Sequence, residues 1–315
     1  MADLKKISVI IPAYNAERFI NKCVESLLKQ SYKNVEIVIV INGSRDNTPA
    51  ICEELADKYN NIKLVKLNPN QGTNWARRAG FEASDGDYIT FSDSDDYIEP
   101  AAYEKAIKVI EENNLDIVQF GLNLVTPDGK VLGQDSPSEM RFNNTRDNFL
   151  YALTLAGALW DKAYRRSMFE NLEWAQMSYF EDSTITIQLF AHAKKFMTMQ
   201  ETFYYYVQNS NSSTHRTHRS TMRDDGINSG NLIADFTRKN IAVCAVGLRQ
   251  ALLDDADDDL IGHQLACLDI GLGLQSHGRA VFDGSAQDVA GGDRGNVPFP
   301  AQDLGLGALA GAGGA

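Results

Sequence analysis

Cysteine is scarce in this chain. Four cysteines occur among 315 residues, and they lie far apart, at Cys23, Cys52, Cys244 and Cys267. Because no two of them have CxxC spacing, the sequence argues against both a zinc knuckle and a compact disulfide framework. We therefore expect buried free thiols.

Long apolar runs are also missing. No run approaches the roughly 18 residues that a membrane-spanning helix needs, and the first residues lead into a short β-branched run without the apolar centre of a signal peptide. The sequence therefore predicts a cytoplasmic protein without an integral membrane segment. Peripheral association with the inner face of the membrane stays open.

Positive charge is in the minority. Lysine and arginine together number 30, against 42 aspartate and glutamate residues, which gives a net charge of -12. Nucleic-acid binding needs a basic face that displaces counterions from phosphates, so the sequence argues against a nucleic-acid partner. With 43% hydrophobic and 23% charged residues, the composition is that of a globular protein.

The end of the chain lacks several residue types. After Asn240 there is no Lys, Glu, Tyr or Trp, and Gly, Ala and Asp dominate. Such a segment offers little periodic apolar surface, so we predict that 240–315 form a separate and partly flexible C-terminal extension. A chimeric or out-of-frame origin would also fit this change in composition.

Strand and helix patterns alternate in the first part of the chain. Residues 7–11 form a β-branched run, and apolar residues at helical spacing follow between Phe19 and Leu28, with Asn15 as the expected N-cap. The alternation continues with strands over 35–41, 62–67, 88–91 and 115–125, and with helices that start at Pro49, contain Trp75 and Phe81, and follow Pro100. Units of this kind predict an α/β fold with a mostly parallel sheet flanked by helices.

The alternation ends after residue 125. A Pro127-Asp128-Gly129 turn introduces a polar region that we expect to be loop-like to about Asn148. Residues from Phe149 to about Val207 are predicted to be helical and then extended, with the aromatic run 203–206 on a strand.

The run Phe-Ser-Asp-Ser-Asp-Asp at 91–96 places three carboxylates at the end of an apolar strand. Such carboxylates repel one another and resist burial, so they need a cation, and open α/β sheets bind ligands at this edge. The spacing of Asp93 and Asp95 suits Mg²⁺ or Mn²⁺, which bind one or two carboxylates and complete their shell with substrate phosphate and water. A solvated acidic loop that caps the helix after Pro100 is the alternative.

Several short motifs occur in the order typical of one family. They are VIIPAYN at 9–15, NGSRDNT at 42–48, NQG at 70–72 with ARRAG at 76–80, GDYI at 86–89 before the Asp motif, WDKAYR at 160–165 and FED at 180–182. Over roughly the first two thirds of the chain, this ordered set resembles the family 2 glycosyltransferases of GT-A fold.

The resemblance implies a Rossmann-like GT-A domain. Residues 1–125 would form its nucleotide-sugar-binding half, and 126–239 its smaller acceptor and catalytic-base half. It also implies a nucleotide-sugar donor, with UDP the expected nucleotide by family frequency, a Mn²⁺ or Mg²⁺ ion, and transfer of a hexosyl or N-acetylhexosaminyl group. The acceptor would be a hydroxyl of a glycan, a lipid-linked glycan or a glycoprotein.

The donor site follows from the same motifs. In the family, the second strand usually ends in Asp-Gly-Ser, whose Asp accepts a hydrogen bond from the base; Asn42 stands in its place here, and a plain Asn42-Gly43 turn is the alternative. Arg77 matches an arginine that approaches the nucleotide, with a solvated helix residue as the alternative. Asp93 and Asp95 would hold the metal. The implied donor-binding residues are Pro12, Ala13, Tyr14, Asn42, Arg77, Asp93, Ser94 and Asp95.

Asp182 is the implied general base, with Glu181 in reserve. We expect it to open a helix over 183–190, whose N-terminus favours the ionised carboxylate that must take the acceptor proton. Simple N-capping of that helix is the alternative.

Three residues are implied on the acceptor side, namely Trp160, Lys162 and Asp96. Trp160 would stack on a sugar ring or pack in the core. Asp96 would face the sugar or cap the next helix. The basic cluster at 215–219 would close over the diphosphate or form a solvated loop.

Together these features predict a metal-dependent, inverting glycosyltransferase, since a single displacement needs a base but no enzyme nucleophile. A nucleotidyltransferase is disfavoured because no Gly-rich loop with Arg and Lys follows the first strand. A non-catalytic nucleotide-sugar-binding or scaffold module of the same fold is the alternative, and it would bind donor and metal without turnover.

Overall fold

The computed structural model describes residues 4–152, 157–174, 180–208, 226–233 and 236. These residues belong to one unit, Met1–Gln250, so most of the predicted C-terminal extension lies outside that unit and all of it outside the described residues. None of the helices that they form is long and apolar enough to cross a membrane. The expected cytoplasmic location stays a prediction.

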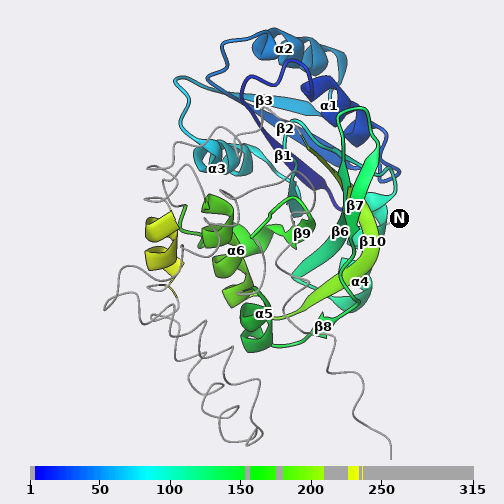
Figure 1. Cartoon of the computed structure of the whole chain (residues 1–315), viewed down its shortest axis with the longest axis vertical. Coiled ribbons are helices and arrows are strands. Elements are labelled where there is room, and N and C mark those ends of the chain that lie inside the picture. Colours follow the sequence, from blue (N-terminus) through cyan, green and yellow to red (C-terminus); the bar gives the residue numbers. More distant parts are fainter. Residues whose placement is uncertain (1–3, 153–156, 175–179, 209–225, 234–235, 237–315) are drawn as a thin grey trace, which may run out of the picture. The chain divides into compact units, whose positions relative to one another are not determined.

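Strands and helices alternate in the first half as predicted (Figure 1). The elements are β1 Ile7–Ala13, α1 Ile20–Leu28, β2 Val35–Asn42, α2 Thr48–Lys58, β3 Ile62–Leu67, α3 Thr73–Ala83, β4 Tyr88–Phe91, β5 Tyr97–Ile98, α4 Ala102–Asn113 and β6 Ile117–Val125. The Asn15 N-cap is wrong, because Phe19 holds the N-cap position of α1. Asn15 instead has a positive φ of 52°, and its side-chain oxygen accepts a hydrogen bond from the Arg45 N–H at 2.8 Å.

The second half is more regular than the sequence indicates. Its elements are β7 Val131–Asp135, β8 Arg141–Phe142, α5 Thr145–Ala152, β9 Lys162–Arg165, a short 3-10 helix Arg166–Phe169, α6 Glu181–His192 and β10 Phe196–Val207. The loop predicted to about Asn148 is therefore wrong: β7 and β8 are short strands that pair with β6 and β10. β7 is largely exposed, so its residues show no alternation of apolar and polar types. The aromatic run 203–206 lies on a strand as predicted.

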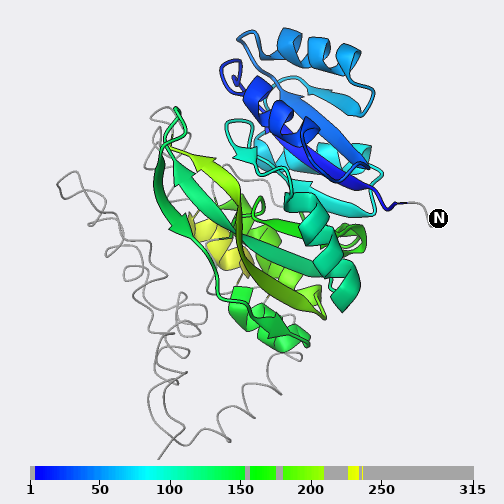
Figure 2. The same ribbon diagram turned by 90° about the vertical axis from the view of Figure 1, so that its right-hand side faces the viewer.

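The described strands form one mixed sheet in the order β3-β2-β1-β4-β9-β6-β10-β5, with β7 on β6 and β8 on β10. β3, β2, β1 and β4 are parallel neighbours, and β6 is parallel to β10. β9, β5, β7 and β8 are antiparallel to the strands they pair with. Figure 2 shows β6 and β10 as long, curved strands beside the parallel half. The α/β fold with helices on both faces is confirmed, and the carboxyl ends of β1, β2 and β4 share one edge.

Each face of the parallel half has its own core. Successive strand residues point to opposite faces, so Val9 and Ile11 belong to a core that includes residues of α1, α2 and α4. Ile10 belongs to a second core, which includes residues of α3, α5 and α6. Burial on both faces explains the continuous apolar runs of these strands. Cys23 and Cys52 are buried free thiols, as expected, and the other two cysteines lie outside the described residues.

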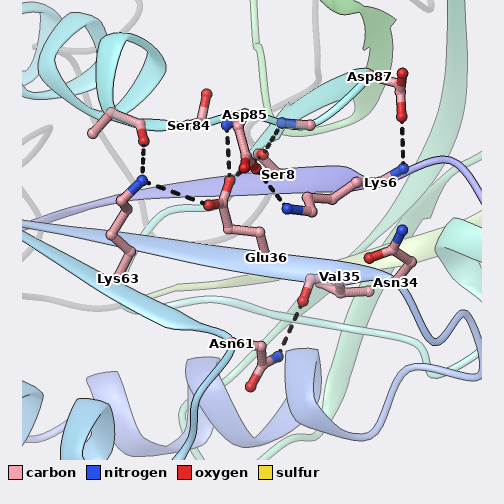
Figure 3. A network of polar contacts seen from close by, with 12 residues as sticks. Lys6, Ser8, Asn34, Val35, Glu36, Asn61, Lys63, Ser84, Asp85 and Asp87 are labelled. Atoms are coloured by element: carbon pink, nitrogen blue, oxygen red, sulfur yellow. Dashed lines mark hydrogen bonds and ion pairs between the residues drawn. The ribbon is translucent and has the colours of Figure 1, made fainter.

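A group of paired charges fixes the other edge of the sheet, where β1, β2 and β4 begin (Figure 3). Glu36 accepts hydrogen bonds from the Ser8 hydroxyl at 2.5 Å and from the Asp85 N–H at 3.1 Å, and it lies 3.9 Å from Lys63 Nζ. Lys6 Nζ donates to Asp85 at 2.8 Å. This amino-edge network of Lys6, Ser8, Glu36, Lys63 and Asp85 ties the connection between α3 and β4 to β1 and β2.

Candidate active site

The Asp motif forms a turn directly after β4. The Asp96 N–H donates to the Asp93 carbonyl at 3.2 Å, and the side chains of Asp93 and Asp95 are half-buried while that of Asp96 is buried. Burial and the charge of Asp93 raise the pKa of Asp95 to about 6. The alternative of a solvated loop that caps α4 is wrong, because Ala101 holds the N-cap position of α4 and no side chain caps it.

Asp93 and Asp95 are the expected ligands of a hard divalent cation, and this assignment stays a prediction. Burial raises the pKa of Asp93 as it does that of Asp95, so both carboxylates would be stabilised by added positive charge. Among the described residues, no group of three or more His, Cys, Asp and Glu side chains could hold a metal ion. Mg²⁺ or Mn²⁺ at this pair would therefore take further oxygens from substrate and water, which is its usual mode with phosphate ligands.

Arg77 of α3 joins the Asp motif to α6. Its guanidinium is 3% exposed; Nη2 lies 3.4 Å from Asp93 Oδ1, and Nη1 lies 3.0 Å from Glu181 Oε1 and also contacts Asp182 Oδ1. Burial lowers the pKa of Arg77, but the three carboxylates, Asp182 first, outweigh it and raise this pKa. The alternative of a solvated helix residue is wrong. Residues more than 100 positions apart in the chain thus form one ion-pair cluster.

Asp182 lies in the first turn of α6, which begins at Glu181 and not at Ser183. Phe180 holds the N-cap position and no side chain caps the helix, so the N-capping alternative is wrong. Burial and the neighbouring Glu181 raise the pKa of Asp182 to about 7, although Arg77 opposes them. A carboxylate of this pKa, 24% exposed, can take up a proton near neutral pH.

Asn42 uses its amide to hold the loop before α3. Its Nδ2 donates to Asn70 Oδ1 at 3.3 Å and to the Gly72 carbonyl at 3.1 Å, while its Oδ1 accepts from the Gln71 N–H at 2.9 Å. Gly43 has a φ of +69°, and a Cβ there would lie 2.4 Å from the Asn70 nitrogen. Asn42 thus ends β2 and orders the loop before α3. Its predicted contact with the base stays a prediction, and so does the alternative of a plain turn.

The other predicted donor residues lie at the same edge. Pro12 and Ala13 end β1 opposite β2, and Tyr14 follows with 47% of its surface exposed. Ser94 is half-buried within the turn of the Asp motif. An exposed aromatic ring beside the carboxyl ends of β1 and β2 is available to a nucleoside, but this contact stays a prediction.

Two predicted acceptor-side residues, Trp160 just before β9 and Lys162 at its start, face inward. Trp160 is half-buried and stacks on Tyr204, with ring centroids 4.3 Å apart, and on Tyr206 at 5.4 Å. Lys162 is 1% exposed and donates to Asp161 Oδ1 at 2.6 Å and to the Ala158 carbonyl at 2.7 Å. Packing is therefore confirmed for Trp160, and the contacts of both residues with an acceptor stay predictions.

Asp96 is buried beneath the site. Its Oδ2 accepts a hydrogen bond from the Tyr204 hydroxyl at 2.8 Å, and its Oδ1 accepts from the Val207 N–H at 2.7 Å. Its predicted contact with the acceptor stays a prediction. Sequence analysis missed Tyr204 as a partner of the Asp motif; the aromatic run 203–206 was the available signal. The basic cluster 215–219 lies outside the described residues.

A comparison with protein-family models matches residues 8–173, more than half of the chain, to "Glycosyl transferase family 2". The chain belongs to glycosyltransferase family 2. The family 2 match includes Arg77, Asp93 and Asp95, and Asp182 lies just beyond it.

Curated relatives agree with this family 2 membership. The uncharacterized glycosyltransferase EpsJ of Bacillus subtilis (strain 168) is 29% identical over 276 residues, which are 83% of this chain and 76% of EpsJ. Glycosyltransferase GlyA of Streptococcus pneumoniae serotype 4 is 32% identical over 217 residues, which are 64% of this chain but only 30% of GlyA.

Solved structures show the same fold for this family 2 chain. The structure of residues 1–349 of S. aureus TarS matches with a TM-score of 0.59 and 24% identity, over 73% of this chain and 64% of that one. TarS is named a poly(ribitol-phosphate) beta-N-acetylglucosaminyltransferase, and its structures include complexes with UDP and UDP-GlcNAc. The match confirms the GT-A fold.

Proposed function

We propose that the protein transfers a hexosyl or N-acetylhexosaminyl group from a UDP-sugar to a hydroxyl group of a glycan, lipid-linked glycan or glycoprotein, with inversion and with Mn²⁺ or Mg²⁺ at Asp93 and Asp95. The observation that carries this proposal is Arg77, whose guanidinium contacts both Asp93 and Asp182. One side chain thereby links a carboxylate of the Asp motif to a carboxylate of near-neutral pKa on α6. The names and bound ligands of TarS support UDP as the donor nucleotide.

The reaction would be a single displacement. The Asp182 carboxylate accepts the proton of the acceptor hydroxyl, and the oxygen of that hydroxyl forms a bond to the anomeric carbon. The bond from this carbon to the diphosphate oxygen breaks, and the nucleoside diphosphate leaves with the electron pair. Attack opposite the leaving group inverts the anomeric configuration, and no enzyme nucleophile is needed.

The leaving nucleoside diphosphate carries negative charge, which must be stabilised as the glycosidic bond breaks. Asp93 and Asp95 would hold a divalent ion, which would neutralise charge on the diphosphate when bound. Arg77 holds Asp93 on one side and Asp182 on the other, so that both carboxylates keep fixed positions while the substrate binds.

Calorimetric titration of UDP, GDP and dTDP, with Mn²⁺ and with chelator, tests the donor site. We expect one nucleotide to bind more tightly with Mn²⁺, and Asp95→Asn to lose that gain. Asp85→Asn, an acidic residue of the amino-edge network, is the matched control and keeps it. Absence of nucleotide binding under every condition would overturn the proposal, and metal-enhanced binding without nucleoside diphosphate release toward any hydroxyl acceptor would favour a non-catalytic module.

A further inference from the structure

Tyr204 of β10 closes the turn of the Asp motif. Its hydroxyl donates to Asp96 Oδ2 at 2.8 Å and accepts a hydrogen bond from the Asp93 N–H at 3.1 Å. The whole side chain is buried, with 0% exposed surface. One hydroxyl therefore holds both ends of the segment that contains Asp95, although Tyr204 is more than 100 residues away in the chain.

The ring of Tyr204 is held from the acceptor side. Trp160 stacks on it at 4.3 Å with an interplanar angle of 18°. Gly157 precedes Trp160 by three residues, and its carbonyl accepts a hydrogen bond from the Thr186 hydroxyl of α6 at 2.8 Å. A Cβ on Gly157 would lie 2.9 Å from the Ser183 nitrogen, next to Asp182. Packed contacts thus run from the start of α6 through Trp160 to Tyr204.

We propose that Tyr204 is a positioning residue that fixes the geometry of Asp93 and Asp95 for metal-dependent binding of a nucleoside diphosphate. This inference rests on the proposed function. Without the hydroxyl, the Asp93 N–H would lose its partner, and of the hydrogen bonds that the described residues donate to the buried Asp96 carboxylate, only that from the Val207 N–H would stay. Buried polar groups rarely remain unpaired, so the turn would relax toward other partners and the two metal-binding carboxylates would move with it.

Tyr205 provides a matched control on the same strand. Its hydroxyl also donates to a carboxylate, that of Glu99, at 2.9 Å, and its ring stacks on Tyr97 at 4.5 Å. Tyr205 therefore has the same chemistry and a similar ring contact, but it makes no contact with Asp93 or Asp96 among the described interactions. Removing its hydroxyl should lower the free energy of unfolding without changing metal-dependent nucleotide binding.

The test compares Tyr204→Phe with Tyr205→Phe. Each variant is titrated with UDP, GDP and dTDP, once with Mn²⁺ and once with chelator. For Tyr204→Phe we expect an affinity in chelator close to that of the wild type and a loss of about thirtyfold in the affinity with Mn²⁺, as two hydrogen bonds of about 1 kcal/mol each would give. Tyr205→Phe should keep the wild-type ratio of the two affinities.

Two outcomes overturn the inference. In the first, Tyr204→Phe keeps the full gain from Mn²⁺. In the second, it loses affinity equally with Mn²⁺ and with chelator, which indicates a general effect on the fold. If Tyr204→Phe does not fold, Asp96→Asn replaces it, since that variant keeps the shape but weakens the hydrogen bond to Tyr204, and the same two outcomes apply. A wild-type protein that binds none of the three nucleotides more tightly with Mn²⁺ overturns the proposed function, and the inference with it.

Discussion

The two edges of the sheet treat acidic residues in opposite ways. At the amino edge, the hydrogen bond from Lys6 lowers the pKa of Asp85, and Glu36 lies near Lys63. At the carboxyl edge, burial raises the pKa of Asp95 to about 6 and that of Asp182 to about 7. At the amino edge, where acidic residues only join strands, lysine side chains balance their charge. At the carboxyl edge, where substrate and metal would bind, carboxylates outnumber the cation that faces them. Perturbed carboxylates of this kind are typical of functional sites.

Exposure separates the edges further. The side chains of Lys6 and Asp85 are 36% and 62% exposed, so solvent screens their ion pair, and such pairs contribute about 0–1 kcal/mol. Arg77 is 3% exposed and faces three carboxylates. Removing a buried ion-pair partner of this kind leaves uncompensated buried charge, so it lowers the free energy of unfolding far more than the loss of an exposed pair does.

The largest expected difference between the edges is in catalysis. Asp182→Asn should lower kcat by about 10²- to 10⁴-fold, because the amide cannot take the acceptor proton. Asp85→Asn should leave kcat unchanged. The measurement is the rate of nucleoside diphosphate release with an acceptor that the wild type uses. Equal rates for Asp182→Asn and the wild type would remove Asp182 as the base and leave Glu181 as the candidate.

The next difference is in stability. Arg77→Gln should lower the free energy of unfolding at pH 7 by about 3–5 kcal/mol, because Asp93, Glu181 and Asp182 lose their shared cation. Lys6→Gln should cost less than about 1 kcal/mol. Urea unfolding measures both. The cost of Arg77→Gln should shrink at pH 5, where the carboxylates can take up protons; a cost that does not change with pH would mean that lost packing, and not repulsion, dominates.

A smaller difference concerns pH. Since the native pKa of Asp95 is about 6 and its unfolded value about 4, the native state binds more protons between these values, and the free energy of unfolding falls as pH rises through this window. Asp95→Asn should therefore stabilise the metal-free protein at pH 8 by on the order of 1–3 kcal/mol. Asp85→Asn should act with the opposite sign, because the pKa of Asp85 is lowered. Urea unfolding at pH 5 and 8 in chelator measures both, and destabilisation by Asp95→Asn at pH 8 would contradict the pKa shift.

The smallest expected effect tests the loop behind the base. Gly157 has a φ of +84°, and a Cβ there would lie 2.7 Å from Ser183 Cα. Gly157→Ala should cost about 1–2 kcal/mol from the left-handed backbone, and it should also lower kcat because α6 must shift. Gly133→Ala is the control, since a Cβ on Gly133 meets nothing within 4 Å. An unchanged kcat for Gly157→Ala would show that the start of α6 tolerates displacement.

Local patterns predicted the parallel half well. β3 and β4 both have the predicted bounds. β4 is a run that its neighbours bury completely, whereas β3 lies at the end of the strand order and combines apolar residues with the exposed Lys63 and Lys66. Asn15 failed as an N-cap because its oxygen bonds to Arg45, a partner that no local pattern contains. The first residues of α5, Thr145 to Asn148, were predicted to be a loop because all four are polar. Their helical conformation is not visible in the local pattern, since only tertiary contacts bury Asn148.

The residues of the candidate site could be predicted, but their contacts could not. Motifs pointed to Arg77, Asp93 and Asp182 separately, whereas the ion pairs that join them depend on how α3 and α6 pack. For Lys162, the motif suggested a contact with the acceptor. In the structure its ammonium group is buried and donates a hydrogen bond to Asp161, a contact that the motif did not indicate. Tyr204 was hidden in an aromatic run, since sequence cannot say which of four neighbouring rings points at the Asp motif.

The buried thiol of Cys23 can report on local opening of the Asp motif. Its thiol lies behind the turn, with Sγ 3.5 Å from the Asp93 carbonyl oxygen and 3.6 Å from Ser92 Oγ, and burial raises its pKa to about 12. A thiol in this state cannot react with an alkylating reagent until that part of the protein opens. In a protein whose other three cysteines are replaced by serine, the labelling rate of Cys23 would therefore time each opening of the turn, and a ligand that closes the turn would slow it.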